Sequence, residues 1–162
     1  MHPTTAVPPA VHLERIIAAP PEQVYRAWLD PDLVRRWMAP GTMQVTRVEV
    51  DERVGGSYRV WQGTDEGAAG GFESVILELD PNRRIVLRWG FVGPARTDGP
   101  VFDSRLTITL TEAPGRSTSL TLVHERLEAL REAMPQVAMS VGVGWSTVLD
   151  RLASTVERAA AP

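Results

Sequence analysis

The chain has 162 residues, a formal net charge of −3 and no cysteine, and all 17 of its basic residues are arginine. These values fit one globular domain, and they exclude thiolate nucleophiles, cysteine metal sites and lysine Schiff-base chemistry. Interspersed charges argue against nucleic acid or an anionic membrane as the main partner, and no apolar run approaches the roughly 20 residues of a membrane span.

The histidines and the two ends of the chain limit the possible chemistry and domain organisation further. Only His2, His12 and His124 occur, too scattered for a histidine-based metal site, so we expect no metal and no cofactor. Residues 1–10, rich in proline, predict a flexible tail, and residues 11–160 predict a single domain. The start lacks the pattern of a secretory signal, and a cytoplasmic location is therefore expected.

The first third of the domain predicts one strand and two short helices. Apolar residues alternate over Val11–Ala18, which predicts a strand ended by Pro20-Pro21. Helical spacing over Glu22–Leu29 predicts the first helix. Asp30 is the expected N-cap of a second short helix, which Pro40-Gly41 ends.

From residue 42 the apolar period becomes two, which predicts strands joined by Gly and Pro turns. Gly63–Gly70 is expected to be a loop, and a Gly/Pro loop precedes the fifth of these strands. We expect six strands, over Thr42–Val50, Ser57–Gln62, Gly71–Leu79, Arg84–Phe91, Val101–Thr111 and Thr118–Glu125.

The last predicted element is a helix from Pro135 to about Arg158, with an apolar stripe along one side. A strand, two short helices, six strands and a long helix make an α+β order. The later strands each have one apolar and one polar face, as in an antiparallel sheet wet on one side. Such a long sheet is expected to curl, with the helix filling its concave face.

Four segments in this order resemble a known family. They read RIIAAPPEQVYRAWLDPDLVRRWMAP (15–40), VDERVGGSYRV (50–60), ILELDPNRRIVLRW (76–89) and GWSTVLDRLA (144–153). The chain resembles the START-like, birch-pollen-allergen-like (SRPBCC) superfamily. Within it, the chain is similar to the family of the C-terminal domain of the activator of the 90-kDa heat-shock-protein ATPase. Where that family usually has two tryptophans after the second helix, this sequence has Trp37-Met38.

The resemblance implies a helix-grip fold, in which a seven-stranded sheet wraps around the C-terminal helix and leaves a cavity between them. Members bind lipids, sterols, polyketides and other hydrophobic molecules, and some superfamily members are cyclases or hydrolases. The resemblance therefore implies a hydrophobic small molecule as the partner, and it leaves open a homodimer with the outward Trp61 as an interface ring.

Alternation along the strands selects the candidate ligand-binding residues. They are inward-facing side chains of the strands, two methionines at the start of the long helix and one tryptophan of that helix. These residues are Tyr58, Val60, Gln62, Glu73, Trp89, Phe91, Phe102, Ser104, His124, Met134, Met139 and Trp145. Large rings near one end of two neighbouring strands are as typical of a pocket lining as of a plain core.

Two of these residues are candidates for proton transfer, with no catalytic assignment beyond that. An inward His124 is a general base or a ligand donor, although a core histidine bonded to a carbonyl or water is the favoured interpretation. An inward Glu73 would have a raised pKa, although a solvated carboxylate at the rim is favoured. Ser104 has no G-x-S-x-G elbow around it, so a serine hydrolase is not supported.

Three functions follow from these observations. The leading one is binding of a hydrophobic or aromatic molecule in the cavity, in a bacterial-type carrier, sequestering or stress and resistance role. The second is a cyclase, lyase or hydrolase without cofactor, using His124 and Glu73 as acid–base partners. The third is a chaperone-activator-like interaction module, which has less support because that activity relies partly on an additional domain.

Overall fold

A computed structural model describes residues 10–93 and 102–160 of the chain. It contains seven strands and four helices in an α+β order. In chain order they are β1 (Val11–Ile17), α1 (Pro21–Leu29), α2 (Pro31–Trp37), β2 (Gln44–Val50), β3 (Ser57–Thr64), β4 (Gly67–Asp80), β5 (Arg84–Val92), β6 (Phe102–Ala113), β7 (Ser117–Glu125), α3 (Glu128–Ala133) and α4 (Pro135–Ala160).

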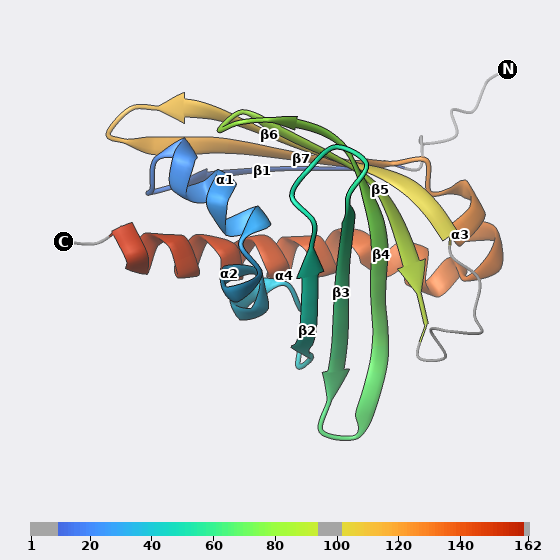
Figure 1. Cartoon of the computed structure of the whole chain (residues 1–162). Coiled ribbons are helices and arrows are strands. Elements are labelled where there is room, and N and C mark those ends of the chain that lie inside the picture. Colours follow the sequence, from blue (N-terminus) through green and yellow to red (C-terminus); the bar gives the residue numbers. More distant parts are fainter. Residues whose placement is uncertain (1–9, 94–101, 161–162) are drawn as a thin grey trace, which may run out of the picture.

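The strands form one curled antiparallel sheet in the order β1-β7-β6-β5-β4-β3-β2. Figure 1 shows α4 lying across the concave face, with α1 and α2 beside it at one end of the sheet. This arrangement confirms the predicted helix-grip fold. Among the described residues, no helix is long and apolar enough to cross a membrane.

The two short helices begin where the sequence predicts. Prolines occupy the first helical turn of both, where a missing N–H is harmless. A carboxylate oxygen of Asp30 accepts a hydrogen bond of 2.9 Å from the backbone N–H of Asp32, which makes Asp30 the N-cap of α2. The second helix ends at Trp37, earlier than the expected stop at Pro40-Gly41.

The closed end of the core lies between these helices, α4 and the sheet. Trp28 and Trp37 meet edge to face with ring centroids 4.7 Å apart, and Leu149 and Leu152 of α4 are fully buried. The hydroxyl of Tyr58 on β3 donates to the carbonyl oxygen of Trp28, which ties α1 to the sheet. The α4 stripe is buried from Val141 onward, as its spacing predicts.

Two local expectations were wrong. Gly63–Gly70 is not a loop, because β3 and β4 continue through it as a hairpin with Thr64 paired to Gly67. Because glycine by itself disfavours strands, the glycine-rich composition of this segment did not indicate the pairing. The helix α3 was not predicted at all. The expected tail up to residue 9, the Gly/Pro loop before β6 and the strand start at Val101 lie outside the described residues.

The inward face of β4 also differs from the prediction. Phe72, Ser74 and Ile76 are buried, whereas Leu77 is 41% exposed. A β-bulge against β5 lies between Ile76 and Glu78, and it reverses which residues face inward on its two sides. Alternation traced back from Leu79 through this bulge therefore assigned the wrong face.

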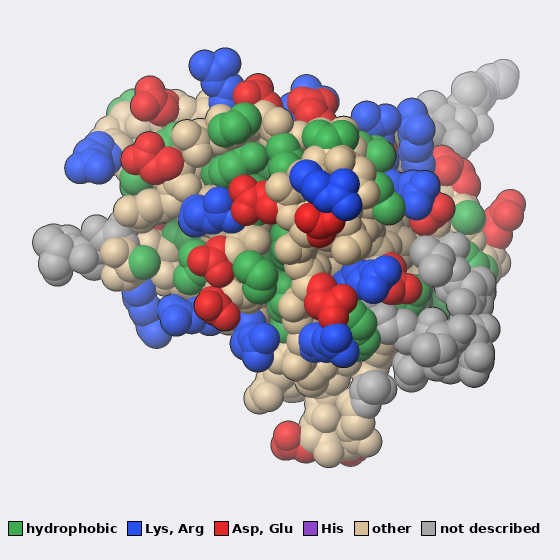
Figure 2. Space-filling view, viewed as in Figure 1, with side chains coloured by type: hydrophobic (Ala, Val, Ile, Leu, Met, Phe, Trp, Pro, Cys, Tyr) green, Lys and Arg blue, Asp and Glu red, His purple; other side chains and the backbone are tan. Residues whose placement is uncertain are grey.

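Glu73 consequently lies on the outer face of the sheet. Its carboxylate is 3.3 Å from the guanidinium of Arg59, which is 3.6 Å from Glu49 on the next strand. Figure 2 shows such acidic and basic side chains interspersed over this surface. Trp61 on the same face is partly covered, because the guanidinium of Arg47 lies 4.8 Å from its ring centroid.

We expect Gly70→Ala to destabilise the protein far more than Gly115→Ala. Both glycines have positive φ, +105° and +78°, but only at Gly70 would an added Cβ collide with backbone, 2.3 Å from the carbonyl oxygen of Val92. Urea unfolding should show a loss of about 2–4 kcal/mol for Gly70→Ala and about 1 kcal/mol for Gly115→Ala. Equal losses would contradict the close approach of β4 to the end of β5.

Candidate functional site

A cavity of about 290 Å³ lies between the sheet and the N-terminal half of α4. Fifteen residues from the sheet, the helix and the α2–β2 loop line it. They are Met38, Pro40, Met43, Gln62, Ala69, Gly71, Phe72, Trp89, Phe91, Val137, Ser140, Val141, Gly144, Trp145 and Val148. The cavity lies in the place that the fold predicts for a ligand.

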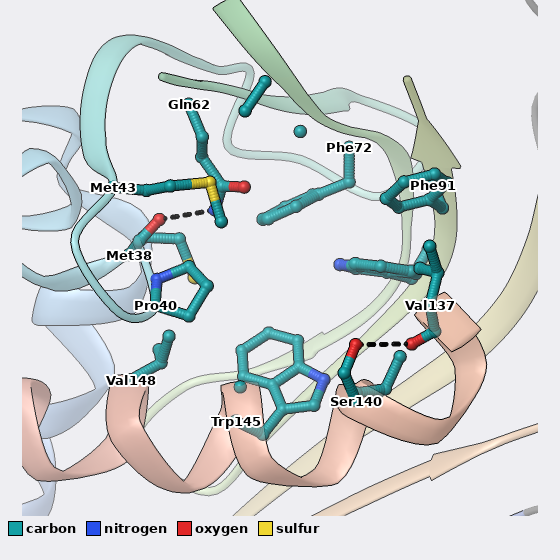
Figure 3. A pocket seen from close by; sticks show the side chains of 15 residues that line it. Met38, Pro40, Met43, Gln62, Phe72, Phe91, Val137, Ser140, Trp145 and Val148 are labelled. Atoms are coloured by element: carbon teal, nitrogen blue, oxygen red, sulfur yellow. Dashed lines mark hydrogen bonds between the residues drawn. The ribbon is translucent and has the colours of Figure 1, made fainter. Parts of the chain in front are cut away.

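Three walls enclose the cavity, and Figure 3 shows how they face one another. Phe72 and Phe91 project from the sheet on one side, and Trp145 and Val148 project from α4 on the other. Met43, on the segment between α2 and β2, points in from a third side. Side chains from these three walls thus border a space that they do not fill.

The wall formed by the α2–β2 loop is held in place from the helix. The guanidinium of Arg151 on α4 donates hydrogen bonds to the carbonyl oxygens of Ala39 and Gly41. At Gly144 an added Cβ would lie 3.7 Å from the Cβ of Pro40, so the loop passes in near contact with the helix backbone. The position of this wall therefore depends on α4.

Polar groups are few in the cavity, and none of the described lining residues carries a charge. The side-chain amide of Gln62 donates from Nε2 to the carbonyl oxygen of Met38 over 2.8 Å. The hydroxyl of Ser140 donates to the carbonyl oxygen of Val137, within the same helix. The described lining is thus neutral and largely apolar.

A chain of hydrogen bonds runs behind the cavity through the fully buried His124. Trp145 donates from its indole Nε1 to Nδ1 of His124 over 2.9 Å. Nε2 of His124 lies 2.7 Å from Oγ of Ser104, which in turn lies 3.1 Å from the carbonyl oxygen of Trp89. The imidazole also meets the ring of Trp89 edge to face, with centroids 4.7 Å apart.

The direction of this chain is fixed because an indole N–H can only donate. Nδ1 of His124 is therefore the acceptor, and Nε2 carries the proton of the neutral ring and donates it to Ser104. Burial lowers the pKa of His124 to about 3, which keeps the ring neutral. A protonated Nε2 cannot take the proton of Ser104, so this Ser–His contact has the wrong polarity to activate a nucleophile.

The sequence-predicted site residues divide into those that line the cavity and those that do not. Four of them line it, namely Gln62, Trp89, Phe91 and Trp145. Tyr58 and Val60 are fully buried in the core beside it. Ser104 and His124 support two of the lining tryptophans, as described above.

The remaining four lie elsewhere. Phe102 is paired with Phe91 across β5 and β6 but does not line the cavity. Met134 and Met139 are 36% and 81% exposed and lie outside the lining. Glu73 faces away from His124 and is paired with Arg59, so the proposed acid–base pair does not form. The adaptable side chains at the cavity are instead Met38 and Met43.

The most important residue that the sequence reasoning missed is Phe72. Its centroid lies 5.2 Å from that of Trp89 and 6.2 Å from that of Tyr58. In the structure Phe72 is the cross-strand partner of both Val60 and Phe91, which were predicted to face inward, but this register follows from the hairpin that the sequence did not indicate. The loop residues Met38, Pro40 and Met43 carry no signal in the sequence either.

Comparisons with known proteins give the same fold. A family model described as "Activator of Hsp90 ATPase homolog 1-like protein" matches residues 18–157. The solved structure of protein CV1439 from Chromobacterium violaceum is 31% identical, with a TM-score of 0.73, covering 91% of this chain and 96% of that one. No curated protein sequence matches the chain.

Two further solved structures are similar. The AHSA1 protein SPO3351 from Silicibacter pomeroyi is 19% identical with a TM-score of 0.76, covering 93% of this chain and 99% of that one. CalU16 from Micromonospora echinospora is 25% identical with a TM-score of 0.60, covering 91% of this chain and 75% of that one. The first of these shows a likeness of fold alone.

We expect the buried His124 to make stability depend on pH above the range where carboxylates titrate. Its pKa is about 3 when folded and about 6.5 when unfolded, so between these values the unfolded chain binds the extra proton. The free energy of unfolding should therefore fall by about 1.4 kcal/mol for each pH unit below 6.5. Urea unfolding between about pH 7.5 and pH 5 measures this slope.

Two variants separate His124 from other groups. His124→Asn should flatten the slope, whereas His12→Asn, at an exposed position on β1, should leave it as in the wild type. If the wild type and His124→Asn lose stability equally over this range, the neutral buried imidazole is disproved.

Proposed function

Since the chain belongs to the Activator of Hsp90 ATPase homolog 1-like family and its curled sheet holds a cavity against α4, we propose that it binds a hydrophobic or aromatic small molecule there. Its role would be that of a carrier, which releases the ligand, or of a sequestering protein, which retains it. In both cases the ligand is not changed chemically. Stress or resistance to a toxic compound is the setting that this role suits.

The observation that carries the proposal is the ring-lined cavity itself. Four aromatic side chains, Phe72, Trp89, Phe91 and Trp145, border an unfilled space of about 290 Å³. Well-packed protein cores leave few voids larger than a water molecule, and apolar cavities tend to stay dry and take up apolar ligands. Removing a ligand's apolar surface from water supplies the binding free energy.

Binding is favoured over catalysis by the state of the two titratable candidates. The lone pair of Nδ1 in His124 is occupied by the indole of Trp145, and Nε2 holds a proton. Glu73 is engaged with Arg59 on the opposite face of the sheet. Neither group is available to transfer a proton to a molecule in the cavity.

The remaining parts of the proposal come from the sequence and the resemblance. We place this role in the cytoplasm and allow a homodimer, although Trp61 is partly covered by Arg47 and is a weaker interface ring than expected. The chaperone-activator alternative rests on the name of the family.

We expect Gly144→Met to weaken ligand binding strongly while Gly142→Met preserves it. Gly144 lines the cavity, and its added Cβ would meet Pro40 only at ordinary contact distance, so a longer side chain there extends over the cavity. Gly142 lies two residues earlier on the same helix, faces Val11 and lies outside the lining. Naphthalene, titrated by calorimetry, is a suitable neutral probe.

The dissociation constant for naphthalene should rise more than about tenfold in Gly144→Met and change less than about twofold in Gly142→Met. Circular dichroism of both variants controls for folding. Absence of saturable naphthalene binding to the wild type, or equal binding by both variants, would refute the assignment of this cavity.

A further inference from the structure

We propose that the cavity selects an uncharged, flat, two-ring phenol, whose hydroxyl oxygen accepts a hydrogen bond from Nε1 of Trp89 and whose hydroxyl proton is donated to Oε1 of Gln62. This inference rests on the proposed binding function and names the chemical class of its ligand. Four features of the lining support it: an unpaired donor, an oriented acceptor, the size and shape of the space, and the absence of charge.

The unpaired donor is the indole N–H of Trp89. This side chain lines the cavity and is 7% exposed, and its Nε1 has no hydrogen-bond partner among the described residues. The other indole of the cavity differs, because Trp145 donates to His124. A buried N–H without a partner costs free energy, which a ligand oxygen would recover.

The acceptor is the side-chain oxygen of Gln62. Its Nε2 donates to the carbonyl oxygen of Met38, and this bond settles which end of the amide is nitrogen. Oε1 must then lie on the other side, and Figure 3 shows it directed into the cavity on the side of Phe72. A hydroxyl group suits a donor and an acceptor together, because one oxygen both accepts and donates.

The size and shape of the space favour two fused rings. A cavity of about 150 Å³ takes up one benzene molecule, so a space of about 290 Å³ accommodates about two rings. The rings of Phe72, Trp89 and Phe91 follow one another along one wall at interplanar angles of 34° and 35°. A gently curved aromatic wall of this kind favours a flat aromatic partner over a branched aliphatic one.

The absence of charge sets the last condition. None of the described lining residues is acidic or basic, and His124 behind the wall is neutral. A carboxylate or ammonium group placed here would lose its hydration without gaining an opposite charge. The ligand is therefore recognised by its hydroxyl group and not by an ion pair.

A series of naphthalene derivatives tests this on the wild-type protein. At about pH 7, calorimetry should rank 1-naphthol first, 1-methoxynaphthalene second and naphthalene third, with about two- to tenfold in affinity between neighbours. The methoxy compound accepts but cannot donate, so it isolates the bond to Trp89. The anion 1-naphthoate should bind at least about tenfold more weakly than naphthalene.

Trp89→Phe keeps an aromatic ring in the wall and removes the donor. The ratio of the 1-naphthol affinity to the naphthalene affinity should fall by about two- to tenfold in this variant, whatever happens to each affinity separately. In the wild type, the indole N–H resonance of Trp89 should move downfield with 1-naphthol or 1-methoxynaphthalene and less with naphthalene. The resonance of Trp145, already bonded to His124, should move little in all cases.

The outcomes separate this inference from the function on which it rests. If naphthalene binds and 1-naphthol binds no better, or if 1-naphthoate binds best, the recognition of a neutral phenol is wrong while the cavity remains a binding site. If the ratio is unchanged in Trp89→Phe and the Trp89 resonance does not respond, Trp89 is not the donor. If no compound of the series binds, the proposed function itself fails.

Discussion

The hydrogen bond from the indole of Trp145 to Nδ1 of His124 determines the direction of every other polar contact behind the cavity. Because the indole only donates, the imidazole proton must lie on Nε2, Ser104 must accept it, and the serine proton is left for the carbonyl oxygen of Trp89. This hydrogen bond joins α4 to β7, and the hydrogen bonds that follow it join β7 to β6 and β6 to β5. A fully satisfied network of this kind fixes the position of the helix over the sheet.

The cavity exists because large rings of the sheet lie opposite small residues of the helix and the hairpin. Toward the C-terminal half of α4, Leu149 and Leu152 fill the space against Trp28, and the core is closed. Toward the N-terminal half, Ser140 and Gly144 leave a space between the helix and the sheet unfilled. The hydrogen bond from Trp145, which lines this space, to His124 fixes α4 against the sheet here.

The sequence was sufficient for the fold but for only four of the fifteen lining residues, and the failures have local physical causes. Alternation in β5, β6 and β7 predicted the faces of Trp89, Ser104 and His124, because these strands pair without a bulge along those segments. It failed at Glu73, because the bulge after Ile76 reverses the faces of β4. Strict alternation contains no sign of an inserted residue.

The loop wall and the polarity of the network were beyond prediction for a different reason. Pro40 borders the cavity because Arg151, more than 100 residues later in the chain, bonds the carbonyl oxygens on either side of it. A contact so distant in sequence has no local pattern. Likewise, the inward position of His124 was predictable, but its role depended on which neighbour donates, and only the tertiary structure places an indole there.

The network also divides the two tryptophans of the cavity into different roles. The N–H of Trp145 is used to hold α4 against the sheet, and the carbonyl of Trp89 is used by Ser104. Among the described residues, the indole N–H of Trp89 has no hydrogen-bond partner, whereas the indole N–H of Trp145 has one. Nε1 of Trp28 and Oγ of Ser74 also lack hydrogen-bond partners among the described residues, but neither of these side chains lines the cavity. Trp89 therefore differs from Trp28 in its position, because a molecule that enters the cavity can supply an acceptor for its indole N–H.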